Sequence, residues 1–230
     1  MVGVRCVQRR AVEAKAPVLL TDRRILRISI AETGERLLDL REHSDLRVDN
    51  RKRGENGVFA RVREGVAERL LAAQGHLPNG LRLVVVEGLR PLALQSHYFA
   101  RYCLELEADH PRWSEARVRQ EASKYVAPPD IVPPHTTGGA VDVALAGSDG
   151  TEIDMGTPVN ASPEESLGAC FTHTAAIPDG AQARRGLLIG AMTAAGFINY
   201  PTEWWHWSYG DRYWAFAAHR PAAIYGPIEA

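Results

Sequence analysis

A block of tryptophans around one acid and one imidazole constrains this chain more than any other stretch. The segment Glu203-Trp204-Trp205-His206-Trp207 holds three of the five tryptophans in the 230-residue sequence. Bulky aromatic side chains build a stiff, water-poor wall, and a carboxylate or an imidazole on such a wall is costly unless it has a polar partner. The chain must therefore fold so that Glu203 and His206 meet partners from elsewhere in the sequence.

A second motif supplies suitable partners. His135 and Asp142 are separated by six residues that include Gly138-Gly139. Zinc takes four tetrahedral ligands, and a hydrolytic site leaves one position for water. His135, Asp142 and His206 would provide three protein ligands, which leaves Glu203 as a general base for a water whose pKa the zinc lowers. The two glycines permit a sharp turn between a ligand on a loop and a ligand on a strand.

The three-residue spacing of Glu203 and His206 limits their backbone conformation. Helical positions three apart share a face, but Pro201 and the run of aromatic residues argue against a helix. In a flat strand, positions three apart point to opposite faces. Either a bulge or a strand end must re-aim one side chain, and we favour Glu203 in the turn that precedes the strand carrying His206.

Each of these residues also has a simpler interpretation. Asp142 could pair with an arginine in a zinc-free scaffold, and Glu203 could be a salt-bridged residue of the wall. Taken singly, these alternatives are at least as good; taken together, with a proline-rich approach to His135, the residues favour a metal site. Five further histidines are interpreted as structural or surface residues: His43, His76, His97, His110 and His219.

Arg90 is the next candidate, because it directly follows a predicted buried strand and precedes Pro91. A cation at that position could polarise the scissile carbonyl and stabilise the oxyanion. The alternative is a structural ion pair with Glu87. Since sites are often assembled at strand ends, we favour the catalytic interpretation.

Periodicity and breaker residues predict one α+β domain preceded by an arm over residues 1–24. Four proline residues make 126–134 a rigid connector, and the long segment 156–182 is expected to be functional or disordered. A hairpin turn is expected at 147–150, with 152–155 pairing back. Strands are expected at 25–30, 37–40, 81–86 and 140–145, and helices at 58–74, 92–110, 113–125 and 183–195.

Composition excludes several classes of function. The net charge of −1 gives no electrostatic case for nucleic acid or an anionic membrane, and no run of eighteen apolar residues exists. The N-terminal residues have no apolar signal-like region. Three distant cysteines, Cys6, Cys103 and Cys170, form no disulfide framework and favour a reducing compartment. We therefore expect a cytoplasmic protein; whether it forms a homo-oligomer stays open.

Four sequence blocks in this order resemble the D-alanyl-D-alanine dipeptidases, the family of the vancomycin-resistance dipeptidase. That family belongs to a wider group of zinc peptidases that share a fold with the hedgehog signalling domain. The similarity runs from about Leu38 to the C-terminus. The blocks are Glu87-Gly88-Leu89-Arg90-Pro91, the stretch from His135 to Asp142, Asp154-Met155-Gly156-Thr157 and Glu203-Trp204-Trp205-His206.

The resemblance implies one zinc ion per chain, held by His135, Asp142 and His206. It implies Glu203 as catalytic base and Arg90 as the arginine that stabilises the transition state. It further implies small D-amino-acid dipeptides as substrates, and a catalytic domain over residues 25–230 with a small, mostly antiparallel sheet flanked by helices.

Two departures from the family pattern fall on the substrate side. Members usually carry Ser where this chain has Pro133. At the position of Asn160, members usually carry an Asp. That Asp resembles the group that holds the free amino terminus of the substrate. A neutral amide can accept a hydrogen bond from an ammonium group but loses the charge-assisted part.

The expected activity is hydrolysis of D-Ala-D-Ala or a related dipeptide. The alternatives are a D,D- or L,D-carboxypeptidase acting on longer cell-wall peptides, a dipeptidase of another specificity, and a non-catalytic zinc-binding module. The physiological role stays open between antibiotic resistance, cell-wall recycling and biosynthesis.

Overall fold

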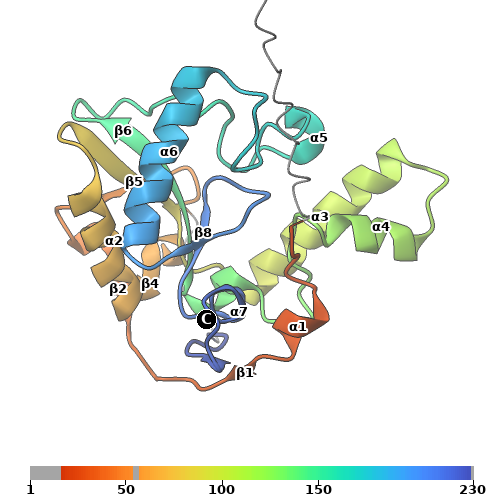
Figure 1. Cartoon of the computed structure of the whole chain (residues 1–230). Helices are drawn as coiled ribbons and strands as arrows, with labels where there is room; N and C mark the ends of the chain where they lie inside the picture. The colour runs from red at the N-terminus through yellow and green to blue at the C-terminus, as the bar shows by residue number, and fades with distance from the viewer. Residues whose placement is uncertain (1–16, 54–56, 229–230) are drawn as a thin grey trace, which may run out of the picture.

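The computed structural model describes residues 17–53 and 57–228 (Figure 1). At the centre of these two ranges lies a five-stranded sheet whose strand order is β3-β5-β6-β8-β7. β3 and β5 run parallel, and the other three pairings are antiparallel. The prediction of an α+β domain with a mostly antiparallel sheet is therefore confirmed. The strands are β3 (Arg47–Val48), β5 (Leu81–Glu87), β6 (Ala140–Gly147), β8 (His206–Ser208) and β7 (Ile198–Asn199).

β5 and β6 form the middle of the core. Their central residues are almost fully buried, which explains why both strands read as continuous apolar runs. The helices α2 (Glu64–His76) and α6 (Asp179–Ala194) contact each other and lie side by side in Figure 1. One hydrophobic cluster joins the two strands to Leu70 of α2, Leu188 of α6 and Trp207 of β8.

The helices α3 (Leu92–Asp109) and α4 (Glu115–Ala122) pack against each other as a hairpin, on the right of Figure 1. This hairpin has its own small buried cluster, made of Phe99, Leu106, Val118 and Ala122. Because α3 begins directly after Arg90 and Pro91, its first turns stay next to the end of β5. None of the helices in the described ranges is both long and apolar enough to cross a bilayer.

Short elements complete the fold. β2 (Leu37–Asp39) pairs with β4 (Arg61–Arg63), and β1 (Ser29–Ile30) pairs with β9 (Ala222–Ala223). The short helices are α1 (Arg23–Leu26), α5 (Pro163–Ser166) and α7 (Arg212–Ala217), and 3₁₀ turns lie at Leu40–Glu42, Val58–Ala60 and Pro134–Thr137.

The expected strands at 37–40, 81–86 and 140–145 are confirmed, as is the helix expected at 92–110. The helix expected at 113–125 is shorter than predicted and is α4. The predicted hairpin after β6 is reduced to a single bridge between Ala146 and Glu152.

Two predicted elements were wrong in part. Residues 25–30 are not one strand, because the Asp22 side chain accepts the backbone N–H of Arg24 and caps the short helix α1. The helix expected from residue 58 begins only at Glu64. Residues 61–63 are held extended because Val62 pairs opposite Leu38 in the β2–β4 ladder.

The segment after β6 also differs from the prediction. α6 begins at Asp179, four residues earlier than expected, because Pro178 presets the backbone entering the helix. Of the predicted N-terminal arm, residues 1–16 lie outside the described residues. Leu20 is buried in a cluster with Ile25, Tyr200 and Tyr213, so this part of the arm packs on the domain; the boundary at residue 24 stays a prediction.

Candidate metal centre

Three predicted metal ligands meet at one end of the sheet. Asp142 on β6 and His206, the first residue of β8, lie directly opposite each other in the antiparallel pairing. His135 comes from the 3₁₀ turn that precedes β6. Gly138 ends that turn with φ of 68°, a conformation that suits glycine. A Cβ on Gly139 would lie 2.5 Å from the Tyr209 carbonyl oxygen, so a side chain there would force the two strands apart.

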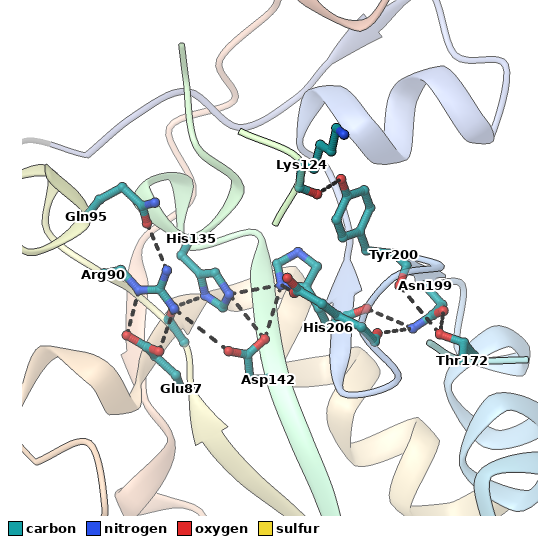
Figure 2. A network of polar contacts seen from close by, with 12 residues as sticks. Glu87, Arg90, Gln95, Lys124, His135, Asp142, Thr172, Asn199, Tyr200 and His206 are labelled. Carbon is teal, nitrogen blue, oxygen red and sulfur yellow. Dashed lines mark hydrogen bonds and ion pairs between the residues drawn. The ribbon is translucent and has the colours of Figure 1, made fainter. Parts of the chain in front are cut away.

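The three ligand atoms form a compact cluster (Figure 2). His206 Nδ1 lies 3.1 Å from both His135 Nε2 and Asp142 Oδ1, and His135 Nε2 lies 3.3 Å from Asp142 Oδ1. All three residues are at most 4% exposed. Among the described residues, they form the one cluster of His, Cys, Asp or Glu close enough to hold a metal ion.

Neighbouring groups orient the imidazole of His135 and keep Asp142 ionised, as metal binding requires. His135 Nδ1 lies 2.8 Å from the Gly88 carbonyl oxygen. Since a carbonyl only accepts, Nδ1 carries the hydrogen, and Nε2 turns its lone pair toward the other ligands. Burial alone would raise the pKa of Asp142, but the adjacent His135 and His206 hold it well below its usual range. Two imidazoles and an ionised carboxylate are a donor set that fits zinc.

Glu203 lies in the turn before β8, as predicted. The turn is closed by hydrogen bonds from Glu203 N to Tyr200 O (2.9 Å) and from His206 N to Glu203 O (3.2 Å). Asn199 Nδ2 donates to the carbonyls of both Glu203 and His206, at 3.1 and 3.0 Å. Thr172 Oγ1 in turn donates to Asn199 Oδ1 (Figure 2). This network fixes the metal-site imidazole and the acid relative to each other.

The Glu203 carboxylate points at the cluster without being part of it. Its Oε2 lies 3.8 Å from His206 Nδ1. Burial raises the pKa of Glu203 to about 7; His206 opposes this shift and the charge of Asp142 reinforces it. A carboxylate with that pKa can both accept and release a proton near neutrality, which is what a general base that later acts as an acid requires.

Arg90 forms the predicted structural ion pair and also lies beside the ligand cluster; its catalytic role stays a prediction. Its Nε and Nη2 form a bidentate ion pair with Glu87 at 2.8 and 2.6 Å, so the structural pair exists. Nη2 also lies 3.8 Å from Asp142 Oδ2, and Nη1 donates to Gln95 Oε1 at 2.8 Å (Figure 2). Among the described residues, these hydrogen bonds occupy three of the five N–H groups, so the guanidinium retains donors for a substrate.

The cluster opens into a cavity of about 310 Å³, a size that suits a small peptide. Every predicted site residue lines this cavity: Arg90, Pro133, His135, Asp142, Asn160, Glu203 and His206. The long segment after β6 contributes Asn160, whose φ of 65° is one that asparagine tolerates. The structure thus brings all seven predicted residues together; their roles stay predictions.

Sequence reasoning missed several residues of the site. Gln95, Lys52 and Tyr98 line the cavity, and Asn199 holds the turn that carries Glu203. Gln95 had a detectable signal, because it is a polar residue that lies little more than one turn after Arg90, near the start of a predicted helix. Lys52 had no such signal in the sequence, since it lies in a charged segment with loop composition.

Two imidazoles and a carboxylate around one point, with a second carboxylate held beside them in a cavity, define a metal-dependent hydrolase. Comparison with known proteins narrows this class. A family model described as D-Ala-D-Ala dipeptidase matches residues 50–221, and the chain belongs to this family of metallopeptidases.

Two relatives carry the same name. The D-alanyl-D-alanine dipeptidase of Synechocystis sp. is 31% identical over 195 residues, covering 73% of this chain and 79% of the relative. The D-alanyl-D-alanine dipeptidase of Escherichia coli is 30% identical over 102 residues, covering 44% of this chain and 51% of the relative.

Among solved structures, the vancomycin-resistance D,D-pentapeptidase VanY in complex with Zn(II) matches with a TM-score of 0.43 and 18% identity. That match covers 79% of this chain and 89% of VanY. The LD-carboxypeptidase LdcB matches with a TM-score of 0.43 and 18% identity, covering 82% of this chain and 75% of LdcB.

Proposed function

We propose that this metallopeptidase is a zinc-dependent dipeptidase of small D-amino-acid dipeptides, with D-Ala-D-Ala as its main substrate and one zinc ion per chain. The observation that carries the proposal is Glu203, which is held 3.8 Å from the imidazole of His206 but outside the ligand cluster. A purely structural metal site has no use for a partly buried acid in that position. The names of both relatives support the substrate class.

The donor set determines what a metal would contribute here. Bound zinc supplies a Lewis acid that polarises the peptide carbonyl and makes water acidic enough to be deprotonated near neutral pH. His135, Asp142 and His206 would hold the ion, and the Gly88 carbonyl keeps the imidazole of His135 in the orientation that this would require.

Proton transfer falls to Glu203. Its carboxylate accepts a proton from the water that attacks the carbonyl carbon, and it donates that proton to the nitrogen as the carbon–nitrogen bond breaks. Arg90 directs its remaining N–H groups at the carbonyl oxygen as negative charge develops there. Its ion pair with Glu87 and its hydrogen bond to Gln95 fix the guanidinium in place before substrate arrives.

The substrate side of the cavity supports a second candidate function. Asn160 lines the cavity with a neutral amide, which binds an ammonium group less strongly than a carboxylate would. Pro133 lines it with a ring that offers no hydrogen bond. A peptide without a free amino terminus would therefore lose little, and a D,D- or L,D-carboxypeptidase acting on longer cell-wall peptides is the alternative.

One experiment separates the two. The zinc content of the purified protein is quantified, and turnover is measured for D-Ala-D-Ala, its N-acetylated form, longer peptides ending in D-Ala-D-Ala, and L,D-peptides. A dipeptidase cleaves the free dipeptide with the highest kcat/KM. Preference for the longer or acetylated peptides would establish the carboxypeptidase instead, and zinc-loaded protein that cleaves none of them would overturn both.

A further inference from the structure

Three cationic side chains gather around one aromatic ring in the wall of the cavity. The ammonium of Lys52 lies 5.0 Å from the centre of the Tyr98 ring. The guanidinium carbons of Arg90 and Arg101 lie 5.1 and 5.5 Å from it. Tyr98 and Arg101 come from α3, and Lys52 comes from the loop after β3. All four side chains line the same cavity as the candidate metal ligands.

A chain of ion pairs connects Lys52 to the metal cluster. Lys52 Nζ lies 3.7 Å from Glu87 Oε2, the oxygen that accepts from Arg90 Nη2 at 2.6 Å. Arg90 in turn reaches Asp142 at 3.8 Å. Both oxygens of Glu87 already accept hydrogen bonds from Arg90, and 3.7 Å is too long for a hydrogen bond. Among the residues that the structure describes, Lys52 therefore retains N–H donors for a ligand.

The charges around the ring do not cancel. Three positive groups face two buried carboxylates, those of Glu87 and Asp142, each 1% exposed; Asp142 is a proposed metal ligand, so a bound zinc ion would offset its charge. Arg101 has an acid partner, Glu105, at 3.4 Å, but both side chains are more than half exposed and the pair is screened by water. The side chain of Lys52 is only 21% exposed, so its charge is screened far less.

The excess positive charge lies on one side of the metal cluster. Figure 2 shows Arg90 and Glu87 on one side of Asp142 and His206 on the other. Glu203 approaches the cluster beside His206, at 3.8 Å. A peptide that spans the cluster therefore meets cations at one end and an acid at the other, and its anionic group belongs at the end with Lys52.

We propose that Lys52, assisted by Arg101 and seated on Tyr98, forms a subsite for an anionic group of the peptide substrate. That group is the C-terminal carboxylate or an acidic side chain next to it. The inference rests on the proposed peptidase function and adds a specificity residue to it. Lys52 supplies most of the effect, because Arg101 is 62% exposed.

The test compares zinc-loaded wild type, Lys52→Met, Lys52→Arg and the control Lys124→Met. Lys124 is also partly buried and paired to a glutamate, Glu121, but does not line the cavity. The peptides are D-Ala-D-Ala, its C-terminal amide, and an amidated dipeptide with an aspartate side chain. KM and kcat are measured for each peptide, and binding is measured separately by calorimetry in the Glu203→Gln background.

Lys52→Met should raise the KM and the dissociation constant for D-Ala-D-Ala about tenfold, leaving kcat and the values for the plain amide almost unchanged. Lys52→Arg should restore most of the affinity, and Lys124→Met should resemble wild type. The aspartate-containing amide distinguishes the two anion sources: its affinity depends on Lys52 only if the subsite takes side chains.

Equal losses for the free acid and the plain amide, or failure of Lys52→Arg to restore binding, would overturn the subsite while leaving the peptidase function intact. Wild type that neither binds nor cleaves any of the peptides would instead overturn the proposed function.

Discussion

Two carboxylates at the same site have opposite acid–base properties because their neighbours differ. Asp142 is buried, yet His135 and His206 hold its pKa well below the usual range. Among the described residues, Glu203 has only His206 at ion-pair distance, and burial raises the pKa of Glu203 to about 7. The first acid stays ionised and suits a metal ligand, whereas the second exchanges protons near neutrality. The division of roles between two acids thus follows from their neighbours.

We predict that Glu203→Gln keeps the metal but loses turnover by about a thousandfold, because the amide fills the same space and cannot accept the proton. His206→Ala should lose the metal itself. Zinc per chain by elemental analysis and turnover of D-Ala-D-Ala measure both. Glu115→Gln, an exposed acid on α4, is the control. A zinc-replete Glu203→Gln protein with normal rates would contradict the role of Glu203.

The residue types at the site could be recognised from the sequence, but their contacts could not. A carboxylate inside the apolar run of β6 and an acid among tryptophans both need partners. The spacing of Glu203 and His206 also predicted a turn before the strand. In contrast, Asn199 stabilises that turn by donating hydrogen bonds to two backbone carbonyl groups. Contacts to the backbone leave no pattern in the residue types, so the sequence did not predict them.

At the scale of elements, the end of β5 connects the β4 region to the metal cluster. Gly88 N donates to Phe59 O at 2.6 Å, and Gly88 O accepts from His135 Nδ1 at 2.8 Å. A Cβ on Gly88 would lie 2.5 Å from the Arg61 carbonyl oxygen, so the β4 region and the end of β5 are in direct backbone contact. The orientation of one metal ligand therefore depends on a strand outside the central sheet.

Gly88→Ala should lower zinc affinity about 10- to 100-fold, because the added methyl group displaces the carbonyl that orients His135. Competition with a chromophoric chelator measures the change. Gly190→Ala is the matched control, since a Cβ there meets nothing within 4 Å on the exposed face of α6. Unchanged zinc affinity in Gly88→Ala would show that the carbonyl does not position the ligand.

The same contacts explain why some elements could not be predicted. The carbonyls of Phe59 and Arg61 accept hydrogen bonds from Gly88 and Leu89, residues almost thirty positions away in the sequence. These bonds hold residues 58–63 out of the helix that their apolar spacing suggests. Strands β5 and β6 could be predicted because a strand that is buried on both faces has a nearly continuous apolar sequence.

At the scale of the whole molecule, tyrosine side chains with raised pKa values make the folded state less stable at alkaline pH. Burial raises the pKa of Tyr213 to about 12, and burial also raises the pKa of four others, Tyr102, Tyr125, Tyr200 and Tyr225. An unfolded tyrosine has a pKa of about 10. Above that pH the unfolded chain loses protons that the folded chain retains, so folding is disfavoured as pH rises.

We predict that the free energy of unfolding, followed upward from about pH 8 where Glu203 is already ionised, is nearly constant to about pH 10 and then falls steeply toward about pH 12. Phenolate absorbance should appear together with unfolding rather than before it. Tyr213→Phe should flatten the decline, because the phenylalanine packs alike and has no proton to lose. Gradual titration of all tyrosines near pH 10 in a protein that stays folded would contradict this account.

The pairing of Asp142 opposite His206 has a consequence for how the chain reaches its native state. β8 has three residues, so few hydrogen bonds hold it in register against β6. A shift by one residue would turn His206 to the other face and leave Trp207 beside Asp142. Because only the correctly aligned strand places His206 beside His135 and Asp142, bound metal would stabilise this register relative to a shifted one.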